Sequence, residues 1–191
     1  MWDQITGHAD PAHVAAVVDL ARRAEPRCGD VVVVAIDGPS GSGKTTLAHD
    51  VTQTLDGQTL HLDRLYPGWD GLAETPGLLA RQVLEPLATG SPAAYVRWDW
   101  DRDQWADTVP VEASRFLVVE GCGSSVLPAR AYAAVRVFVD ADPILRKRRG
   151  ITRDGESYRP HWDQWAAQEA ALFGRDGTRQ HADLLIDTTS V

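Results

Sequence analysis

The chain has 191 residues, with 27 acidic and 19 basic side chains and a formal net charge of −8. This length suits one α/β domain with a substantial core, and we expect a single domain over residues 1–191. The acidic balance argues against a nonspecific nucleic-acid or membrane-surface binder, so neither partner is expected. Two cysteines without CxxC spacing indicate a reducing compartment, and neither a signal peptide nor a membrane span is indicated. We therefore expect a cytoplasmic protein, for which homo-oligomerisation remains open.

Helix signals and apolar runs alternate along the chain. Asp10-Pro11 followed by valines at helical spacing predicts a helix over 11–25. The run 31–36 is apolar at every position, which is typical of a central parallel strand covered on both faces. Further helices are expected at 45–55, from 75 with a bend or end at Pro86, and from 142 into a basic cluster. Another is expected over 160–173, with a stop at Gly174. Further strands are expected at 58–62, 115–120, 135–140 and 183–187.

This alternation predicts an α/β fold, a three-layer sandwich with a five-stranded parallel sheet and helices on both faces. Ligands of such sheets bind beyond the carboxyl ends of the strands. The residues that end the predicted strands are acidic, namely Asp37, Asp63, Glu120 and Asp140.

The stretch 35–46 (AIDGPSGSGKTT) contains the phosphate-binding loop pattern, between a strand and a helix signal. Its glycines allow several backbone N–H groups to face one anion, and the following helix adds its positive dipole end. Lys44 is expected to reach the β- and γ-phosphates, and the Thr45 hydroxyl to bind Mg²⁺. The pattern predicts ATP and Mg²⁺ as cofactors, held by Gly38, Ser40, Gly41, Ser42, Gly43, Lys44, Thr45 and Thr46.

Two of the strand-end carboxylates fit catalytic roles. Asp63 can take the proton of an acceptor hydroxyl, and the competing interpretation is a backbone cap. Glu120 follows four hydrophobic residues, where a buried acid without a metal would be costly, so we expect it to hold Mg²⁺. Asp37 fits either a supporting contact to the metal or a structural role, and Asp140 a structural role.

Five cations lie within residues 146–153 of this acidic protein. Arg146, Arg149 and Arg153 fall on one helical face at i, i+3 and i+7, whereas Lys147 and Arg148 are expected to point elsewhere. Guanidinium groups suit a phosphate clamp, so Arg146 is assigned to nucleotide binding and Arg149 and Arg153 to catalysis. The alternative is a solvated helix end enriched in cations by the dipole.

The segment 64–112 is expected to form an acceptor-binding insert. Between 66 and 112 it holds three basic and eight acidic residues, with six Trp and Tyr side chains. Aromatic rings among hydrogen-bonding groups suit a flat or polyol acceptor, and the charge disfavours an acceptor that already bears phosphate. Each Trp fits a core or a pocket position equally well. The candidate acceptor-binding residues are Asp63, Tyr66, Trp69, Tyr95, Arg97, Trp98 and Asp99.

Four motifs in order resemble the uridine kinase and phosphoribulokinase-like branch of P-loop kinases. They are the loop GPSGSGKTT, Asp63-x-x-Tyr66, Val118-Val119-Glu120-Gly121, and Arg146-x-x-Arg149-x-x-x-Arg153-Asp154. The resemblance implies a P-loop NTPase fold of the nucleoside-kinase type, with a short Arg-rich lid and its following helix over 142–175. It also implies an ATP-dependent kinase with Asp63 as base, Lys44 and Thr45 on phosphate and Mg²⁺, Glu120 near the metal, and Arg149 and Arg153 in the lid.

The departures from that family lie on the acceptor side. Trp98-Asp99-Trp100 is not followed by the family's histidine, and the lid after Asp154 is short. The loop also resembles cytidylate kinases, but their D-x-G-x-x-Y-R motif is absent after Asp63. We expect transfer of phosphate to a hydroxyl of a nucleoside or similar metabolite. The alternatives are a nucleoside monophosphate kinase and an ATP-binding regulatory protein.

Overall fold

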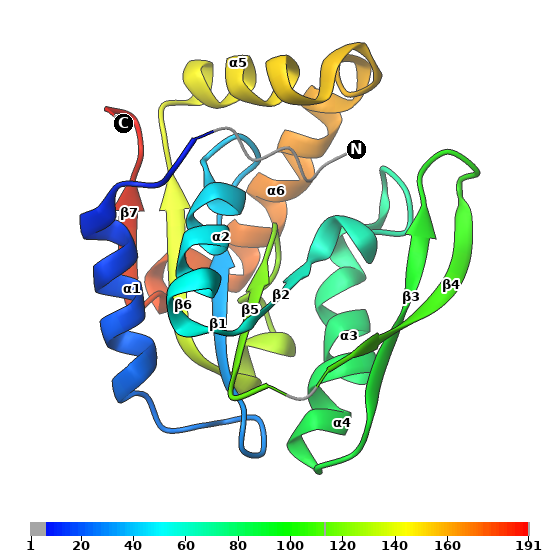
Figure 1. The fold of residues 1–191 in the computed structure, drawn as a ribbon. Helices are drawn as coiled ribbons and strands as arrows, with labels where there is room; N and C mark the ends of the chain where they lie inside the picture. Colours follow the sequence, from blue (N-terminus) through cyan, green and yellow to red (C-terminus); the bar gives the residue numbers. More distant parts are fainter. Residues whose placement is uncertain (1–6, 113, 191) are drawn as a thin grey trace.

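A five-stranded parallel sheet organises the structure, a computed structural model that describes residues 7–112 and 114–190. In spatial order the strands are β2 (Gln58–His61), β5 (Phe116–Glu120), β1 (Val32–Asp37), β6 (Ala133–Asp140) and β7 (Leu184–Asp187). All four strand pairs are parallel. Every carboxyl end therefore lies at one edge of the sheet, which Figure 1 shows beneath helix α5 (Pro143–Asp154). The predicted α/β sheet of five strands is confirmed.

Helices cover both faces of this sheet. They are α1 (Pro11–Arg23) and α2 (Lys44–Leu55) on one face, and α3 (Thr75–Leu79) and α6 (Trp162–Asp176) on the other. The β1 residues alternate between the faces: Val34 and Ile36 pack with α1 and α2, whereas Val33 packs with the opposite cluster. The run of consecutive apolar residues thus reflects burial on two sides.

The segment after β2 forms a group of helices and a hairpin that packs at the β2 side of the sheet. Helix α3 continues through a π-helical turn (Ala80–Leu84) into α4 (Glu85–Ala88), followed by an antiparallel hairpin of β3 (Ala93–Asp99) and β4 (Gln104–Val111). Pro86 was expected to bend or end the helix. The helix runs two residues past it, and the π-turn just before it is the irregularity that a proline without an N–H produces.

Two predicted helix ends are wrong. Helix α1 ends at Arg23 rather than at residue 25, because Ala24 already has extended backbone ahead of Pro26. Helix α6 passes through Gly174 and ends at Asp176, where Gly177 takes the left-handed conformation that closes a helix, with φ of 67°. Glycine is tolerated inside a helix whose neighbours are packed, so position 174 gave a false stop.

Short 3₁₀ turns complete the chain at Leu62–Arg64, Gly71–Ala73, Ala129–Tyr132, Gly155–Ser157, Arg159–His161 and Thr178–His181. Within the part of the chain that the structure describes, no helix combines the length and apolar character needed to cross a membrane. Residues 1–6, 113 and 191 of the predicted domain lie outside the described residues, and the division into an insert and a lid stays a prediction.

Candidate active site

The phosphate loop connects β1 to α2 at the carboxyl edge of the sheet. Three of its glycines have positive φ angles, 134° at Gly38, 77° at Gly41 and 94° at Gly43. A Cβ at Gly41 would lie 2.2 Å from the carbonyl oxygen of Arg146, and one at Gly38 would lie 2.0 Å from that of Val139. The glycines are therefore required both by the positive φ angles of the loop backbone and by the close approach of β6 and α5.

Asp37 anchors the loop from below. Its buried carboxylate accepts N–H groups of Gly38 at 2.7 Å, Gly123 at 2.8 Å and Ser125 at 2.7 Å, and the Ser125 hydroxyl at 3.0 Å. Burial raises the pKa of Asp37, against the opposing effect of these N–H donors and of Lys44. Asp37 thus joins the loop to the segment after β5. Of the two roles that the sequence suggested for Asp37, this contact is the structural one.

Lys44, Thr45 and Glu120 meet at the start of α2. The Lys44 ammonium is almost fully buried and donates to the carbonyl oxygen of Pro39 at 2.9 Å. The Thr45 hydroxyl lies 3.4 Å from Glu120 Oε1, which lies 2.7 Å from Nδ1 of His61. Sequence reasoning missed His61, although its position at the end of β2, beside Glu120 in the parallel register, could have indicated it.

Oxygen donors of this kind fit Mg²⁺. A hydroxyl and one carboxylate beside an anion cradle match the way Mg²⁺ is usually bound, through one or two protein oxygens, substrate phosphates and water. The described residues contain no group of three or more His, Cys, Asp or Glu side chains placed to hold a metal by themselves. The donor set therefore suits a metal that arrives with a nucleotide.

A second buried acid, Glu169 of α6, holds the loop from the other side. It accepts the Ser40 N–H at 2.8 Å and the Ser40 hydroxyl at 2.6 Å, and the Cys122 thiol lies 3.1 Å away. Sequence reasoning missed Glu169. The signal was available, because Glu169 lies four residues after Trp165 and three before Leu172, on the buried face of the helix.

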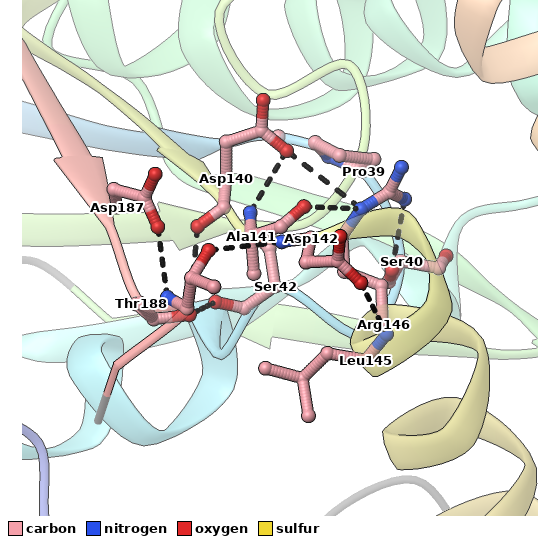
Figure 2. A network of polar contacts seen from close by, with 12 residues as sticks. Pro39, Ser40, Ser42, Asp140, Ala141, Asp142, Leu145, Arg146, Asp187 and Thr188 are labelled. Carbon is pink, nitrogen blue, oxygen red and sulfur yellow. Dashed lines mark hydrogen bonds and ion pairs between the residues drawn. The ribbon is translucent and has the colours of Figure 1, made fainter.

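The arginine-rich helix α5 lies over the loop. Arg146 donates to the carbonyl oxygens of Ser40 at 3.3 Å and Ala141 at 3.1 Å, and lies 3.7 Å from Asp140. Figure 2 shows this network, in which Thr188 after β7 also donates to the Ser42 carbonyl oxygen at 2.8 Å. Arg146 therefore ties the loop to the end of β6.

The next two arginines of the predicted face have different partners. Arg149 donates to the hydroxyl and carbonyl oxygens of Thr188 at 2.9 and 3.0 Å. Arg153 makes a bidentate pair with buried Asp154, both contacts at 2.7 Å. Burial acts to lower the pKa of Arg153, but the adjacent Asp154 carboxylate raises that pKa above its ordinary value. Lys147 points away to Asp163 at 2.7 Å.

A cavity of about 690 Å³ opens between the loop, α5 and the β2 side of the sheet. It brings together Ser40, Gly41, Gly43, Lys44, Thr45, Thr46, Asp63, Tyr66, Trp69, Glu120, Arg149 and Arg153 of the predicted site. Gly38, Ser42 and Arg146 lie outside its lining. Arg148 does line it, so the prediction that this residue points elsewhere is wrong. The helix crosses the cavity mouth, and consecutive long side chains reach the opening.

One wall of the cavity is aromatic. Trp69 stacks on His161 at 4.2 Å and on Tyr158 at 5.4 Å between ring centroids, and it contacts Trp100 at 4.8 Å. The indole N–H of Trp100 donates to the backbone oxygen of Asp63 at 2.8 Å. Asp63 itself lies in the 3₁₀ turn after β2 and lines the cavity. The acceptor end predicted near Asp63 is thus enclosed by rings from three separate segments.

The structure does not bring four predicted acceptor residues to this wall. Tyr95 is buried in the core, Arg97 pairs with Asp107 across the hairpin at 2.6 Å, and Trp98 packs edge-on against Trp105. Asp99 accepts the N–H groups of residues 101 and 102 and so caps the hairpin turn. Trp100, which lies in that turn, takes the place at the cavity.

Other lining residues were not predicted. Sequence reasoning did not assign His8, Ala9, Asp10, His13, Trp100, Cys122, Tyr158, Trp165, Ile186 or Thr188 to the site. Most of them come from elements far away in sequence, and no motif marks them.

The chain has a P-loop fold. A phosphate loop follows the central strand of the parallel sheet, a carboxylate ends the adjacent strand, and an arginine-rich helix lies over the loop. No family model matches the chain. It is 27% identical over 171 residues to a cytidylate kinase of Pyrobaculum arsenaticum, covering 83% of this chain and 85% of the relative. It is 24% identical over 178 residues to a uridine kinase of Staphylococcus epidermidis, covering 81% and 86%.

Among solved structures, a possible uridine kinase from Bacillus stearothermophilus superposes with a TM-score of 0.65. The match has 19% identity and covers 92% of this chain and 98% of that one. At this identity the match shows a shared fold. The predicted uridine kinase-like P-loop fold is confirmed.

Proposed function

We propose that the protein transfers the γ-phosphate of ATP to a hydroxyl group of a small, nucleoside-like acceptor. The observation that carries this proposal is that Asp63 and the aromatic wall line the same cavity as Lys44, Thr45 and Glu120 of the phosphate-binding side. Phosphoryl transfer requires a donor cradle and an acceptor site to share one enclosed space, from which water is kept. The curated relatives are kinases by name, which supports the reaction class.

On the donor side, the loop amides and Lys44 bind and orient the phosphates. Lys44 now contacts the Pro39 carbonyl oxygen, a neutral partner that an anionic phosphate would displace. Thr45 and Glu120 would hold Mg²⁺, which when bound neutralises charge on the β- and γ-phosphates. The second partner of Glu120, His61, keeps that carboxylate directed at Thr45.

On the acceptor side, Asp63 accepts the proton of the attacking hydroxyl. The Trp100 indole, through its bond to the Asp63 backbone, fixes the turn that presents this carboxylate. Trp69 and Trp100 are partly exposed and line the cavity, where aromatic rings can contact a flat acceptor. The aromatic wall therefore orients the acceptor and excludes water around its hydroxyl.

Arginines of α5 close the donor side. Arg148, Arg149 and Arg153 are the arginines among the described lining residues, and all three come from this helix. They are suited to the phosphate chain of ATP and to charge that develops during transfer. A nucleoside monophosphate as acceptor would instead need cations on the aromatic side. The arginines of the described lining all come from α5 and none from the segment that supplies Trp69 and Trp100, which supports the hydroxyl acceptor over the monophosphate kinase alternative.

A panel of nucleosides, sugars and vitamins with ATP and Mg²⁺ tests the proposal. We expect at least one acceptor to stimulate ADP release and to appear as a phosphorylated product by mass spectrometry. If no acceptor does so while ATP binds, the ATP-binding regulatory alternative holds. Phosphorylation of a monophosphate in preference to its nucleoside would favour the monophosphate kinase.

Replacement of the proposed base gives a sharper prediction. Asp63→Asn is expected to lower kcat by about 10²-fold or more and to leave ATP affinity unchanged, because the general base acts in the transfer step. The matched control is Asp56→Asn at the exposed end of α2, where asparagine tolerates the left-handed backbone. Equal turnover of Asp63→Asn and wild type would remove Asp63 from the mechanism.

Lys44→Ala tests the donor side independently. We expect this variant to lose the rise in melting temperature that ATP gives the wild type, because Lys44 is the cation of the cradle. An ATP-dependent rise of unchanged size would contradict the loop assignment.

A cytoplasmic location is part of the proposal and agrees with the two buried cysteines, neither of which forms a disulfide.

A further inference from the structure

The cavity has two ends, which the strand order separates. The aromatic end with Asp63 lies on the β2 side of the phosphate loop. The opposite end lies on the β7 side, beyond Thr46 and Leu47 of α2, and there the lining consists of Ile186, Thr188 and part of residues 8–13. We call residues 8–13 the N-terminal arm. The lining residues of the arm are His8, Ala9, Asp10 and His13.

The arm is fastened to the helix that follows the phosphate loop. The Ala9 N–H donates to Asp50 Oδ2 at 2.8 Å, and Nδ1 of His8 lies 3.2 Å from Asp50 Oδ1. The Asp50 side chain is 15% exposed and lies on α2, six residues after Lys44. Asp10 then caps α1 through the Ala12 N–H at 2.8 Å. These contacts hold the arm in place beside the loop before any ligand binds.

The direction of the phosphate chain assigns a role to this end. The γ-phosphate has to face Asp63 for transfer to occur, so the nucleoside must extend in the opposite direction, towards the β7 side. Ile186, although largely buried, lines the cavity there, and Arg149 donates to the Thr188 hydroxyl at 2.9 Å at the same end. The arm supplies further lining residues of the same cavity, among them His13.

From this placement we infer that the N-terminal arm binds the nucleoside part of ATP, with the His13 side chain in contact with the purine nucleoside. The inference rests on the proposed function, because it takes ATP as the ligand. A purely structural role does not account for His13. Helix α1 is attached to the sheet through buried Val17, Val18 and Ala21, whereas His13 is partly exposed at the cavity.

The test compares ATP with inorganic tripolyphosphate, which has the phosphate chain but no nucleoside. Binding of each ligand to the full chain is measured by titration calorimetry with Mg²⁺ present. His13→Ala is expected to weaken ATP binding by about fivefold to tenfold, the loss of one good contact, and to leave tripolyphosphate binding unchanged. Asp50→Ala removes both fastening contacts of the arm and is expected to show the same selective loss.

His49→Ala is the control, since this neighbour of Asp50 lies on the same helix but outside the cavity lining. It should bind both ligands as the wild type does. Unchanged tripolyphosphate binding also shows that each variant is folded. The inference is overturned if ATP affinity is unchanged in His13→Ala and Asp50→Ala, or if both ligands lose affinity equally. A wild type that binds tripolyphosphate but gains nothing from the nucleoside overturns it too, whereas a wild type that binds neither ligand overturns the proposed function itself.

Discussion

Two buried carboxylates shape the phosphate loop at the level of single residues. Asp37 gathers three N–H groups beneath the loop, and Glu169 holds Ser40 from the α6 side. Both acids are anchors for the backbone and not part of the loop pattern itself. The loop geometry therefore depends on residues that a search for the glycine-lysine motif does not include.

Loss of the Asp37 carboxylate should lower the free energy of unfolding by about 2–4 kcal/mol. In Asp37→Ala, several buried N–H groups lose their acceptor at once, and each such loss costs about 1–3 kcal/mol before relaxation. Urea unfolding followed by circular dichroism measures the change. Asp37→Asn, which keeps one acceptor oxygen, should lose less, and an alanine variant as stable as wild type would show that the anchor is dispensable.

Glu169 is expected to act on ligand binding through Ser40. Glu169→Ala removes the acceptor of the Ser40 N–H and hydroxyl, so the loop loses its fixed shape and ATP affinity should fall by about tenfold. Glu169→Gln retains an acceptor oxygen and should keep most of the affinity. Titration of each variant with ATP gives the comparison, with exposed Glu156→Gln as the control. If alanine and glutamine variants bind ATP alike, Ser40 does not need this partner.

At the level of secondary-structure elements, an ion pair lies where β6 begins to pair with β7. The Arg136 guanidinium makes two bonds to Asp183, at 3.0 and 2.6 Å, and the Arg136 N–H donates to the same carboxylate at 2.8 Å. Burial acts to raise the pKa of Asp183, but the contacts with Arg136 lower that pKa below its ordinary value of 3.8. The pair fixes the register of the edge strand.

The lowered pKa predicts how this pair depends on pH. The folded protein binds fewer protons at Asp183 than the unfolded chain, so its contribution is complete above the ordinary pKa of 3.8 and disappears as pH falls through the folded value. Asp183→Asn should cost about 1 kcal/mol or less at pH 7, because solvent screens the pair. The difference from wild type, measured by urea unfolding, should shrink below about pH 4; a constant difference would contradict the ionic origin.

The hairpin shows where prediction from sequence reached its limit. Sequence patterns gave the five parallel strands and the phosphate loop, because apolar runs and glycine spacing act locally. Trp98 and Trp100 have the same alternation, yet Trp98 packs on Trp105 and Trp100 lies at the cavity. The difference arises in the turn that Asp99 caps, where strand alternation ends. Which tryptophan faces the acceptor depends on that turn and on tertiary packing, so the pattern alone could not select it.

Across the whole molecule, the predicted site residues that one motif supplies line a common cavity, whereas sequence reasoning missed lining residues that come from distant segments. Glu169 and Thr188 contact the phosphate loop at Ser40 and Ser42, and His8 lies beside Asp50 of helix α2, which follows the loop. No local sequence pattern predicts that such distant residues lie close together. These contacts follow from the strand order, which places β1 in the centre and β7, the last strand, at the edge beside α1.

The two thiols should report global unfolding. Cys28 and Cys122 are buried; burial raises the pKa of Cys28 to about 11 and also raises the pKa of Cys122. Because the thiolate is the reactive form, iodoacetamide at pH 8 should label the folded protein at least ~10-fold more slowly than the chain in urea. Mass spectrometry counts the labels over time. Rapid labelling of Cys122 in the folded protein would mean that the site opens locally.

Support of Ser40 by Glu169 also sets an order of events during translation. The two residues are 129 positions apart, so at about 5–20 residues per second the ribosome completes the loop about 6–26 s before Glu169 is added. Throughout that interval the nascent chain carries a complete glycine-lysine motif without the carboxylate that shapes it. Full nucleotide affinity is therefore acquired only after Glu169 has been synthesised and has folded against Ser40.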